Sequence, residues 1–165
     1  MKKCDNMQDI IQLDFPQYKF RVRQTNNGTE IFDIIRKKFV VLTPEEWVRQ
    51  HTVHFLIRER QIPAGRMNVE VSLQTLHLSR RADIIVFDGL GEPLAIVECK
   101  APSIKITQNA FDQIARYNMD LKASYLFVTN GLSHFCCFIN KDMNTYIFLE
   151  SIPNYKEMIK GNLSR

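Results

Sequence analysis

The clearest feature in the pattern of apolar and polar positions is a pair of apolar runs on either side of a turn. Residues Ala82–Phe87 and Leu94–Cys99 are almost entirely apolar, and the first run is rich in β-branched and aromatic side chains. The six residues between them, Asp88–Pro93, include two glycines, an aspartate and a proline, which turns favour. The pattern predicts a β-hairpin. Because both faces of each strand are apolar, we expect this hairpin within a sheet that is covered on both sides.

A helix is predicted to start shortly after residue 42. Thr43 suits the N-cap, Pro44 suits the first helical position, and Glu46 suits the third position of a capping box. Apolar residues then recur through about Arg60, and the helix should end before Pro63. Glu46 thereby has a structural role in prospect, whereas the neighbouring glutamate is left free for another one.

Runs that alternate in polarity or are apolar throughout predict further strands, at 18–23, 30–33, 38–42, 69–76, 124–129, 134–139 and 146–149. Helical spacing predicts a helix over 106–121, with Thr107 as a candidate N-cap, and a closing helix over 153–160. The core order is helix, strand, hairpin, helix, strand. It predicts an α/β fold with a central mixed β-sheet flanked by helices, because a crossover helix makes its two flanking strands parallel.

The chain is expected to form a single domain with three parts. Asn26–Gly28 is a strong turn signal, so residues 1–42 are predicted to form an arm and an N-terminal β-hairpin appendage. The basic residues of this part favour a solvated strand face over a contact with phosphate. Residues 43–150 would form the core, and residues 151–165 a C-terminal tail or helix.

The length of the central turn sets a register for the hairpin. If Asp88 pairs with Pro93 across a four-residue loop, Asp83 stands opposite Glu98, and Lys100 shares the face of Glu98. Isolated charges are costly to bury, so these three groups should pair, bind a metal or lie at the open end of the strands. Two carboxylates suit a hard cation such as Mg²⁺, and an ammonium group can stabilise charge on a phosphate. A structural ion pair between strands is the alternative.

Composition and charge place few further limits on function. The chain has 165 residues, 45% of them hydrophobic, and a net charge of +4, which permits a nucleic-acid partner without requiring one. No apolar run approaches the roughly 20 residues that span a bilayer, and the N-terminus shows no apolar signal segment. We therefore expect no membrane association and a cytoplasmic location.

Cysteine and histidine spacing does not favour a zinc site. The four cysteines are Cys4, Cys99, Cys136 and Cys137, and none of them forms a C-x-x-C pair. The adjacent pair lies in an apolar run and is predicted to be buried. His51 and His54 are three positions apart on the first predicted helix, but no third ligand stands at a matching spacing.

Asp83, followed by Glu98-Cys99-Lys100 at the end of the next strand, resembles the PD-(D/E)xK nuclease signature. The strings Arg-Arg-Ala-Asp-Ile-Ile-Val and Ile-Val-Glu-Cys-Lys-Ala-Pro are more similar still to one branch, the N-terminal nuclease domain of type I restriction enzyme R subunits. Ala82 stands where the generic signature has proline. The resemblance spans about Leu42 to Phe138. It implies a restriction-endonuclease-like core, Mg²⁺ or Mn²⁺ as cofactor, and DNA as substrate.

The resemblance also implies roles for individual residues of the central hairpin and the first helix. Asp83 and Glu98 would hold the metal together with the backbone carbonyl of Cys99, and Lys100 would support the attacking water. This branch carries a glutamate on its first helix, four positions before an arginine. Glu45 and Arg49 match that spacing, so Glu45 is expected as an additional metal or water ligand. Glu46 is the second choice.

Further residues are predicted to contact the substrate. Gln113 and Tyr117 match a Gln-x-x-x-Tyr motif on the helix after the Glu-x-Lys strand, so Gln113 would orient the lysine or contact a phosphate, and Tyr117 would contact the substrate. Arg80 and Arg81 precede Asp83 and could bind a phosphate, but they could equally pair with local carboxylates. Arg49 is a further predicted substrate contact.

One departure from the full restriction subunit limits the resemblance. The chain has no G-x-x-x-x-G-K-[ST] phosphate loop, so it resembles a nuclease module without an ATP-driven motor in the same chain. It would act with separate restriction-modification or motor subunits, and cutting of both strands would favour a homodimer. The alternative function is a non-catalytic nucleic-acid-binding or assembly module that retains the nuclease fold.

Overall fold

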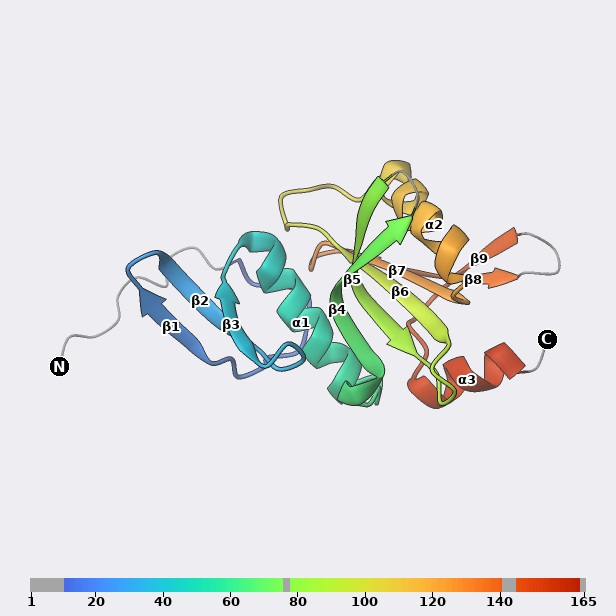
Figure 1. The fold of residues 1–165 in the computed structure, drawn as a ribbon, viewed down its shortest axis with the longest axis horizontal. Coiled ribbons are helices and arrows are strands. Elements are labelled where there is room, and N and C mark those ends of the chain that lie inside the picture. The colour runs from blue at the N-terminus through green and yellow to red at the C-terminus, as the bar shows by residue number, and fades with distance from the viewer. Residues whose placement is uncertain (1–10, 76–77, 141–144, 164–165) are drawn as a thin grey trace.

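A six-stranded mixed sheet forms the centre of the protein in the computed structural model, which describes residues 11–75, 78–140 and 145–163 (Figure 1). Its strands follow one another in chain order across the sheet. They are β4 (Met67–Thr75), β5 (Leu78–Phe87), β6 (Pro93–Cys99), β7 (Tyr125–Thr129), β8 (His134–Asn140) and β9 (Thr145–Leu149). Only β6 and β7 pair in parallel among these strands. The predicted mixed sheet is therefore confirmed, and the parallel pair is the one that the crossover helix joins.

Helices cover both faces of this sheet, as the apolar pattern of the hairpin predicted. The helices are α1 (Pro44–Arg58), α2 (Gln108–Leu121) and α3 (Tyr155–Leu163), with a short 3₁₀ turn at Ala64–Arg66. One buried cluster joins Val48 of α1 and Met158 of α3 to Val97 of the sheet. A second cluster joins Ile114 of α2 to Ile96. Because Ile96 and Val97 are consecutive, α2 covers the face opposite to α1 and α3 (Figure 1).

The central hairpin has the predicted register along its strands and a different turn. Ile84 pairs with Val97 and Val86 with Ala95, which is the register that brings position 83 beside position 98. At the turn, Phe87 pairs with Pro93, and the register shifts between residues 86 and 87. The predicted pairing of Asp88 with Pro93 is therefore wrong by one residue. The Asp88 carboxylate instead accepts hydrogen bonds from two backbone N–H groups of the loop.

The start of α1 confirms half of the predicted capping box. The Thr43 hydroxyl accepts a hydrogen bond from the N–H of Glu46 at 3.0 Å, and Pro44 occupies the first turn. The Glu46 carboxylate, however, does not reach back to the N-cap, because it binds the guanidinium groups of Arg36 and Arg49. A charged partner outcompetes the neutral backbone N–H that the capping box offers. The structural role expected for Glu46 is therefore an ion-pair role.

The predicted N-terminal hairpin is present, and a third strand extends it to a three-stranded antiparallel sheet. Its strands are β1 (Val22–Thr25), β2 (Gly28–Asp33) and β3 (Lys38–Val41). The strand predicted over 18–23 starts later than expected because Tyr18 and Phe20 pack against the histidines of α1. In Figure 1 this sheet lies beside α1, on the side away from the six-stranded sheet. Of the helices in the described part of the chain, none is long and apolar enough to cross a membrane.

Candidate active site

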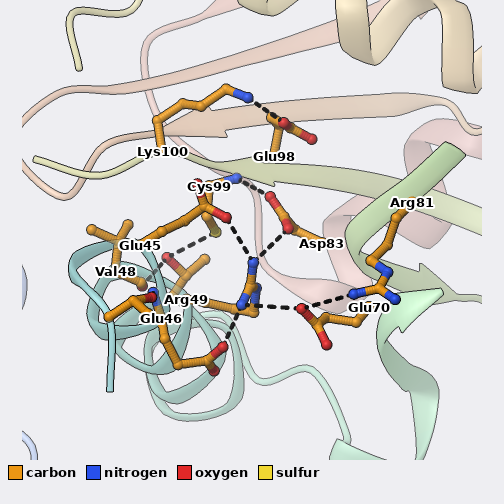
Figure 2. A network of polar contacts seen from close by, with 12 residues as sticks. Glu45, Glu46, Val48, Arg49, Glu70, Arg81, Asp83, Glu98, Cys99 and Lys100 are labelled. Carbon is orange, nitrogen blue, oxygen red and sulfur yellow. Dashed lines mark hydrogen bonds and ion pairs between the residues drawn. The ribbon is translucent and has the colours of Figure 1, made fainter. Parts of the chain in front are cut away.

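Adjacent strands bring three of the predicted catalytic groups together at one end of the central hairpin (Figure 2). Asp83 lies on β5, Glu98 on β6, and Lys100 directly after β6. One Asp83 oxygen, Oδ2, accepts a hydrogen bond from the backbone N–H of Cys99 at 2.7 Å. The Lys100 ammonium group donates to Glu98 Oε1 at 2.6 Å. The hairpin register thus places two carboxylates and one ammonium group within a single small cluster.

Burial leaves Glu98 as the most perturbed carboxyl group of this cluster. Its residue is 3% exposed. Burial, and then the negative charge of Asp83, raise the pKa of Glu98 to about 7, against the lowering effect of Lys100. Its second oxygen, Oε2, is buried and has no hydrogen-bond partner in the described structure. A buried acceptor without a partner is costly, so this oxygen is a place where a cation or a donor would be favourable.

Gln113 of α2 connects the lysine and the glutamate. Its amide oxygen accepts a hydrogen bond from the Lys100 ammonium group at 3.1 Å, and its amide nitrogen donates to Glu98 Oε1 at 2.9 Å. Burial lowers the pKa of Lys100, but the hydrogen bond to Glu98 and the nearby carboxylates outweigh it and raise that pKa, so the lysine is held as a cation. The sequence placed Gln113 beside the lysine, and its contacts fix the orientation of both charged groups.

Arg49 of α1 is the hub of a second set of contacts on the other side of Asp83. Its guanidinium group donates to Asp83 Oδ1 at 2.7 Å and to Glu45 at 3.1 Å, and it also binds Glu46. Its side chain is 5% exposed. Burial lowers the pKa of Arg49, but the charges of Asp83 and Glu46 outweigh it and raise that pKa. This burial argues against the predicted contact of Arg49 with substrate. The arginine instead positions the carboxylates.

The two glutamates at the start of α1 both bind Arg49, but their exposure and their other neighbours differ. Glu45 is 45% exposed in its side chain and contacts Arg49. Burial and the charge of Asp83 raise the pKa of Glu45, and Arg49 and Lys100 oppose that effect. Glu45 therefore lies within electrostatic reach of the hairpin cluster. Glu46 is buried and also binds Arg36, away from the hairpin lysine.

Two residues of this network were missed from the sequence. Glu70 of β4 binds Arg36 at 2.8 Å and lies 3.6 Å from Arg49 and 3.5 Å from Arg81. It stands between Val69 and Val71, whose partners on β5 flank Asp83, but its register was not readable because no recognisable turn sequence joins β4 to β5. Arg36 lies in the turn after β2, and only long-range packing brings it to Glu46. No sequence motif near Arg36 predicts such a contact.

The remaining predicted substrate contacts are less defined. Arg81 has a side chain that is 59% exposed, and its partner in this structure is Glu70. Arg80 and Tyr117 lie on β5 and α2, but their side chains are outside the described residues. Arg81 therefore pairs with a local carboxylate, which is one of the two roles predicted for the arginines. Its guanidinium group is also exposed enough to reach a phosphate.

The donor set suits a hard divalent cation although the side chains do not form a ready cage. Within the described residues, no three His, Cys, Asp or Glu side chains converge closely enough to hold a metal ion. Arg49 and Lys100 are bound to the carboxylates at these positions. Carboxylate and carbonyl oxygens are nevertheless the ligands that Mg²⁺ takes. The unpartnered oxygen of Glu98, next to the charge of Asp83, is the feature of this chain that such an ion would satisfy.

Comparison with known proteins places the chain in a family. The family model described as type I restriction enzyme R protein N terminus (HSDR_N) matches residues 44–153, about two thirds of the chain. The chain belongs to this family. The HSDR_N match begins at α1 and includes every predicted catalytic and metal-binding residue. No curated protein sequence matches this chain closely enough to count as a relative.

A solved structure shares the fold. It is a fragment assigned as an HsdR subunit of a type I restriction enzyme from Vibrio vulnificus YJ016, with a TM-score of 0.51 and 17% sequence identity. The similarity covers 68% of this chain and 24% of the Vibrio chain. This HSDR_N chain therefore spans about a quarter of that relative, and the mixed α/β fold is what the two have in common.

Proposed function

We propose that this HSDR_N domain is a Mg²⁺-dependent endonuclease that hydrolyses phosphodiester bonds in DNA. The observation that carries the proposal is the convergence of Asp83, Glu98 and Lys100 at one end of the hairpin, with the buried Glu98 Oε2 left without a partner. A carboxyl group whose pKa is raised by burial and by a neighbouring carboxylate, next to a fixed ammonium group, is typical of a site that works on a charged substrate.

The residues divide into a metal-holding group and a substrate-facing group. Asp83 and Glu98 would hold the metal with the carbonyl of Cys99, and Glu45 would be an additional ligand. A bound Mg²⁺ supplies Lewis acidity toward a phosphoryl oxygen and lowers the pKa of a coordinated water. Mn²⁺ has the same preference for oxygen ligands and is expected to replace it.

The protein's own groups then assist hydrolysis. The oxygen of water forms a bond to phosphorus while the bond to the leaving sugar oxygen breaks, and that oxygen takes up a proton. Lys100 is held as a cation and would stabilise the negative charge that develops on the phosphate. Gln113 holds the lysine in place through a 3.1 Å hydrogen bond. Arg81, with its exposed side chain, would bind a neighbouring phosphate.

DNA and other restriction-modification subunits are the partners that the R-protein family suggests. These 165 residues contain no G-x-x-x-x-G-K-[ST] motif, so any ATP-driven translocation along DNA would be the work of a part or a subunit outside them. Cutting of both strands would need two of these sites, which favours a homodimer on the DNA.

Plasmid cleavage tests the proposal. We expect the parent protein to nick or linearise plasmid DNA with Mg²⁺ or Mn²⁺, and Lys100→Ala and Glu98→Ala proteins to lose this activity. Lys105→Ala is the matched control, because Lys105 is an exposed lysine in the loop that follows the site. Equal cleavage by the parent, Lys100→Ala and Glu98→Ala proteins would place the activity elsewhere and reject the proposed site.

One observation favours a second candidate, the non-catalytic DNA-binding or assembly module. Arg49 and Lys100 already neutralise Asp83 and Glu98, so the cluster is also stable as a purely structural network. Thermal unfolding with added Mn²⁺ separates the two. A bound metal at 100 times its Kd stabilises by about 2.7 kcal/mol, and that shift should disappear in Asp83→Asn. Absence of any shift in the parent would favour the non-catalytic module.

A further inference from the structure

One face of the N-terminal sheet carries arginine and phenylalanine side chains side by side. The pairing of β1 with β2 and of β2 with β3 places alternate residues on the same side of this sheet. We name this side the outer face. Its residues are Arg21, Arg23, Glu30, Phe32, Phe39 and Val41.

The two arginines lie over the two aromatic rings. The Arg21 guanidinium carbon is 4.2 Å from the centroid of the Phe32 ring, and that of Arg23 is 4.0 Å from the centroid of the Phe39 ring. A guanidinium group stacked on a ring covers apolar surface with its plane and keeps its N–H edge available to an oxyanion. The stacking therefore fixes two cations in a defined orientation on the sheet.

Arg21 has no ion-pair partner within the described part of the protein. Arg23 pairs with Glu30 at 2.6 Å, but no carboxylate contact to Arg21 occurs among the described residues. Arg21 and Arg23 are both exposed. The opposite face of the sheet carries the buried Ile31 and Asp33, which shows that the sheet packs on the protein through that other face.

The net charge of the protein is concentrated in this part of the chain. Residues 18–42 hold six basic residues and two acidic ones, a net charge of +4. The whole chain also has a net charge of +4, so the remaining residues sum to zero. Charge complementarity therefore directs a polyanion to the N-terminal sheet more strongly than to the rest of the surface.

The outer face lies close in the chain to the candidate active site. Arg23, Glu30 and Val41 stand in one row across the three strands. Val41 is followed within four residues by Glu45 at the start of α1, and Glu45 contacts Arg49 of the site. In Figure 1 the three-stranded sheet and the central hairpin lie on either side of α1. The edge of the outer face and the first residue of the site are therefore separated by only four positions of the chain.

We propose that the outer face binds the phosphate backbone of DNA and holds the duplex next to the active site. The inference rests on the proposed function for the identity of the polyanion. It does not rest on catalysis, because backbone binding needs no metal. Arg21 and Arg23 are the phosphate contacts, and Phe32 and Phe39 are the platform that orients them. These contacts read no base sequence, since phosphates carry none.

Fluorescence anisotropy with a labelled DNA duplex in EDTA tests the proposal without cleavage. Removal of one arginine–phosphate interaction should weaken binding roughly eightfold at about 0.1 M salt and reduce the slope of log K against log salt by about 0.9. We expect this weakening in Arg21→Ala and in Arg23→Ala, and a summed effect in the double variant. Arg21→Lys, which keeps the charge and removes the planar stacking, should retain part of the affinity.

The control is a Lys156→Ala, Lys160→Ala protein, which loses the same charge from exposed positions on α3. Its affinity should stay near that of the parent. An equal loss in the control would mean that net charge alone drives binding, and no loss in the Arg21 and Arg23 variants would leave this face for an acidic protein. Either result overturns the proposal. Circular dichroism of each variant excludes unfolding as the cause.

Hydrolysis of a small phosphodiester, bis(p-nitrophenyl) phosphate, separates this proposal from the proposed function. Such a substrate reaches the metal site without reaching the outer face. The Arg21→Ala, Arg23→Ala protein should hydrolyse it at the parent rate while cutting plasmid less well. If the parent does not hydrolyse it and does not bind metal, the proposed endonuclease fails, and an arginine-dependent DNA affinity would still support the outer face as a binding surface.

Discussion

Replacement of Arg49 by methionine is the sharpest test of the charge network around the site. Arg49 contacts Asp83, Glu45 and Glu46 directly, and its side chain is 5% exposed. Methionine keeps the apolar stem and removes the charge, so the loss of stability reports the ion pairs rather than a cavity. Removal of one partner from a buried ion pair costs about 3–5 kcal/mol, because the remaining charge stays buried.

The same substitution at Arg23 is the matched control. Arg23 has one carboxylate partner, Glu30, and a side chain that is 53% exposed. An exposed ion pair contributes about 0.2–1 kcal/mol, and its contact with the Phe39 ring adds about 0.5–1 kcal/mol. We therefore expect Arg49→Met to lower the free energy of unfolding by at least about 1 kcal/mol more than Arg23→Met.

Urea unfolding at neutral pH without metal measures both variants. The midpoint should fall while the m-value stays constant, since the surface exposed on unfolding does not change. If Arg49→Met costs no more than Arg23→Met, the reasoning is refuted. Asp83 and Glu46 would then be stabilised by something other than this guanidinium group, and Arg49 would be free for the substrate contact that the sequence suggested.

Three smaller predictions concern stability away from the hairpin. Thr43→Ala should cost about 1 kcal/mol in urea unfolding because it removes the N-cap of α1, whereas Thr43→Ser should be nearly neutral. Gly131→Ala should cost about 1–3 kcal/mol, since Gly131 has φ +82° and a Cβ there would lie 2.7 Å from Leu13; a wild-type melting curve would contradict this. Burial lowers the pKa of His54, so its unfolded form binds more protons and stability is lost as the pH falls below about 6.5. The raised pKa of Glu98 acts with the opposite sign, so the histidine effect is measured as the difference between the pH profiles of the parent and His54→Gln, and identical profiles would exclude it.

Local signals account for the parts of the fold that the sequence predicted correctly. The start of α1 follows from Thr43 and Pro44, which act on their own backbone neighbours. The hairpin follows from two apolar runs and a turn between them. The parallel pairing of β6 and β7 follows from the helix that joins them. The first two features depend on residues close together in the chain, and the third follows from the general rule for crossover helices, so periodicity, turn chemistry and element order suffice.

The polar network of the site could be predicted only in part. Lys100 and Glu98 are two residues apart, and Gln113 lies on the next helix. Their order along the chain matches the motifs of the family, so these three residues were predicted together. Glu70 and Arg36 come from separate elements whose contacts depend on tertiary packing. The start of the N-terminal strand was also predicted too early, again because of tertiary packing. Aromatic rings of the segment before β1 pack on α1, so this segment has the alternating pattern of a strand but does not form one.

Arg36 shows why the N-terminal sheet is more than an appendage. Its guanidinium group binds Asp33 at 2.6 Å, Glu46 at 2.6 Å and Glu70 at 2.8 Å, and Asp33 is fully buried. The family match covers residues 44–153, so two carboxylates inside it take a cation from outside it. A buried carboxylate without its partner is strongly destabilising. The α/β core therefore depends electrostatically on the N-terminal part of the chain, because Arg36 supplies a cation that Glu46 and Glu70 share.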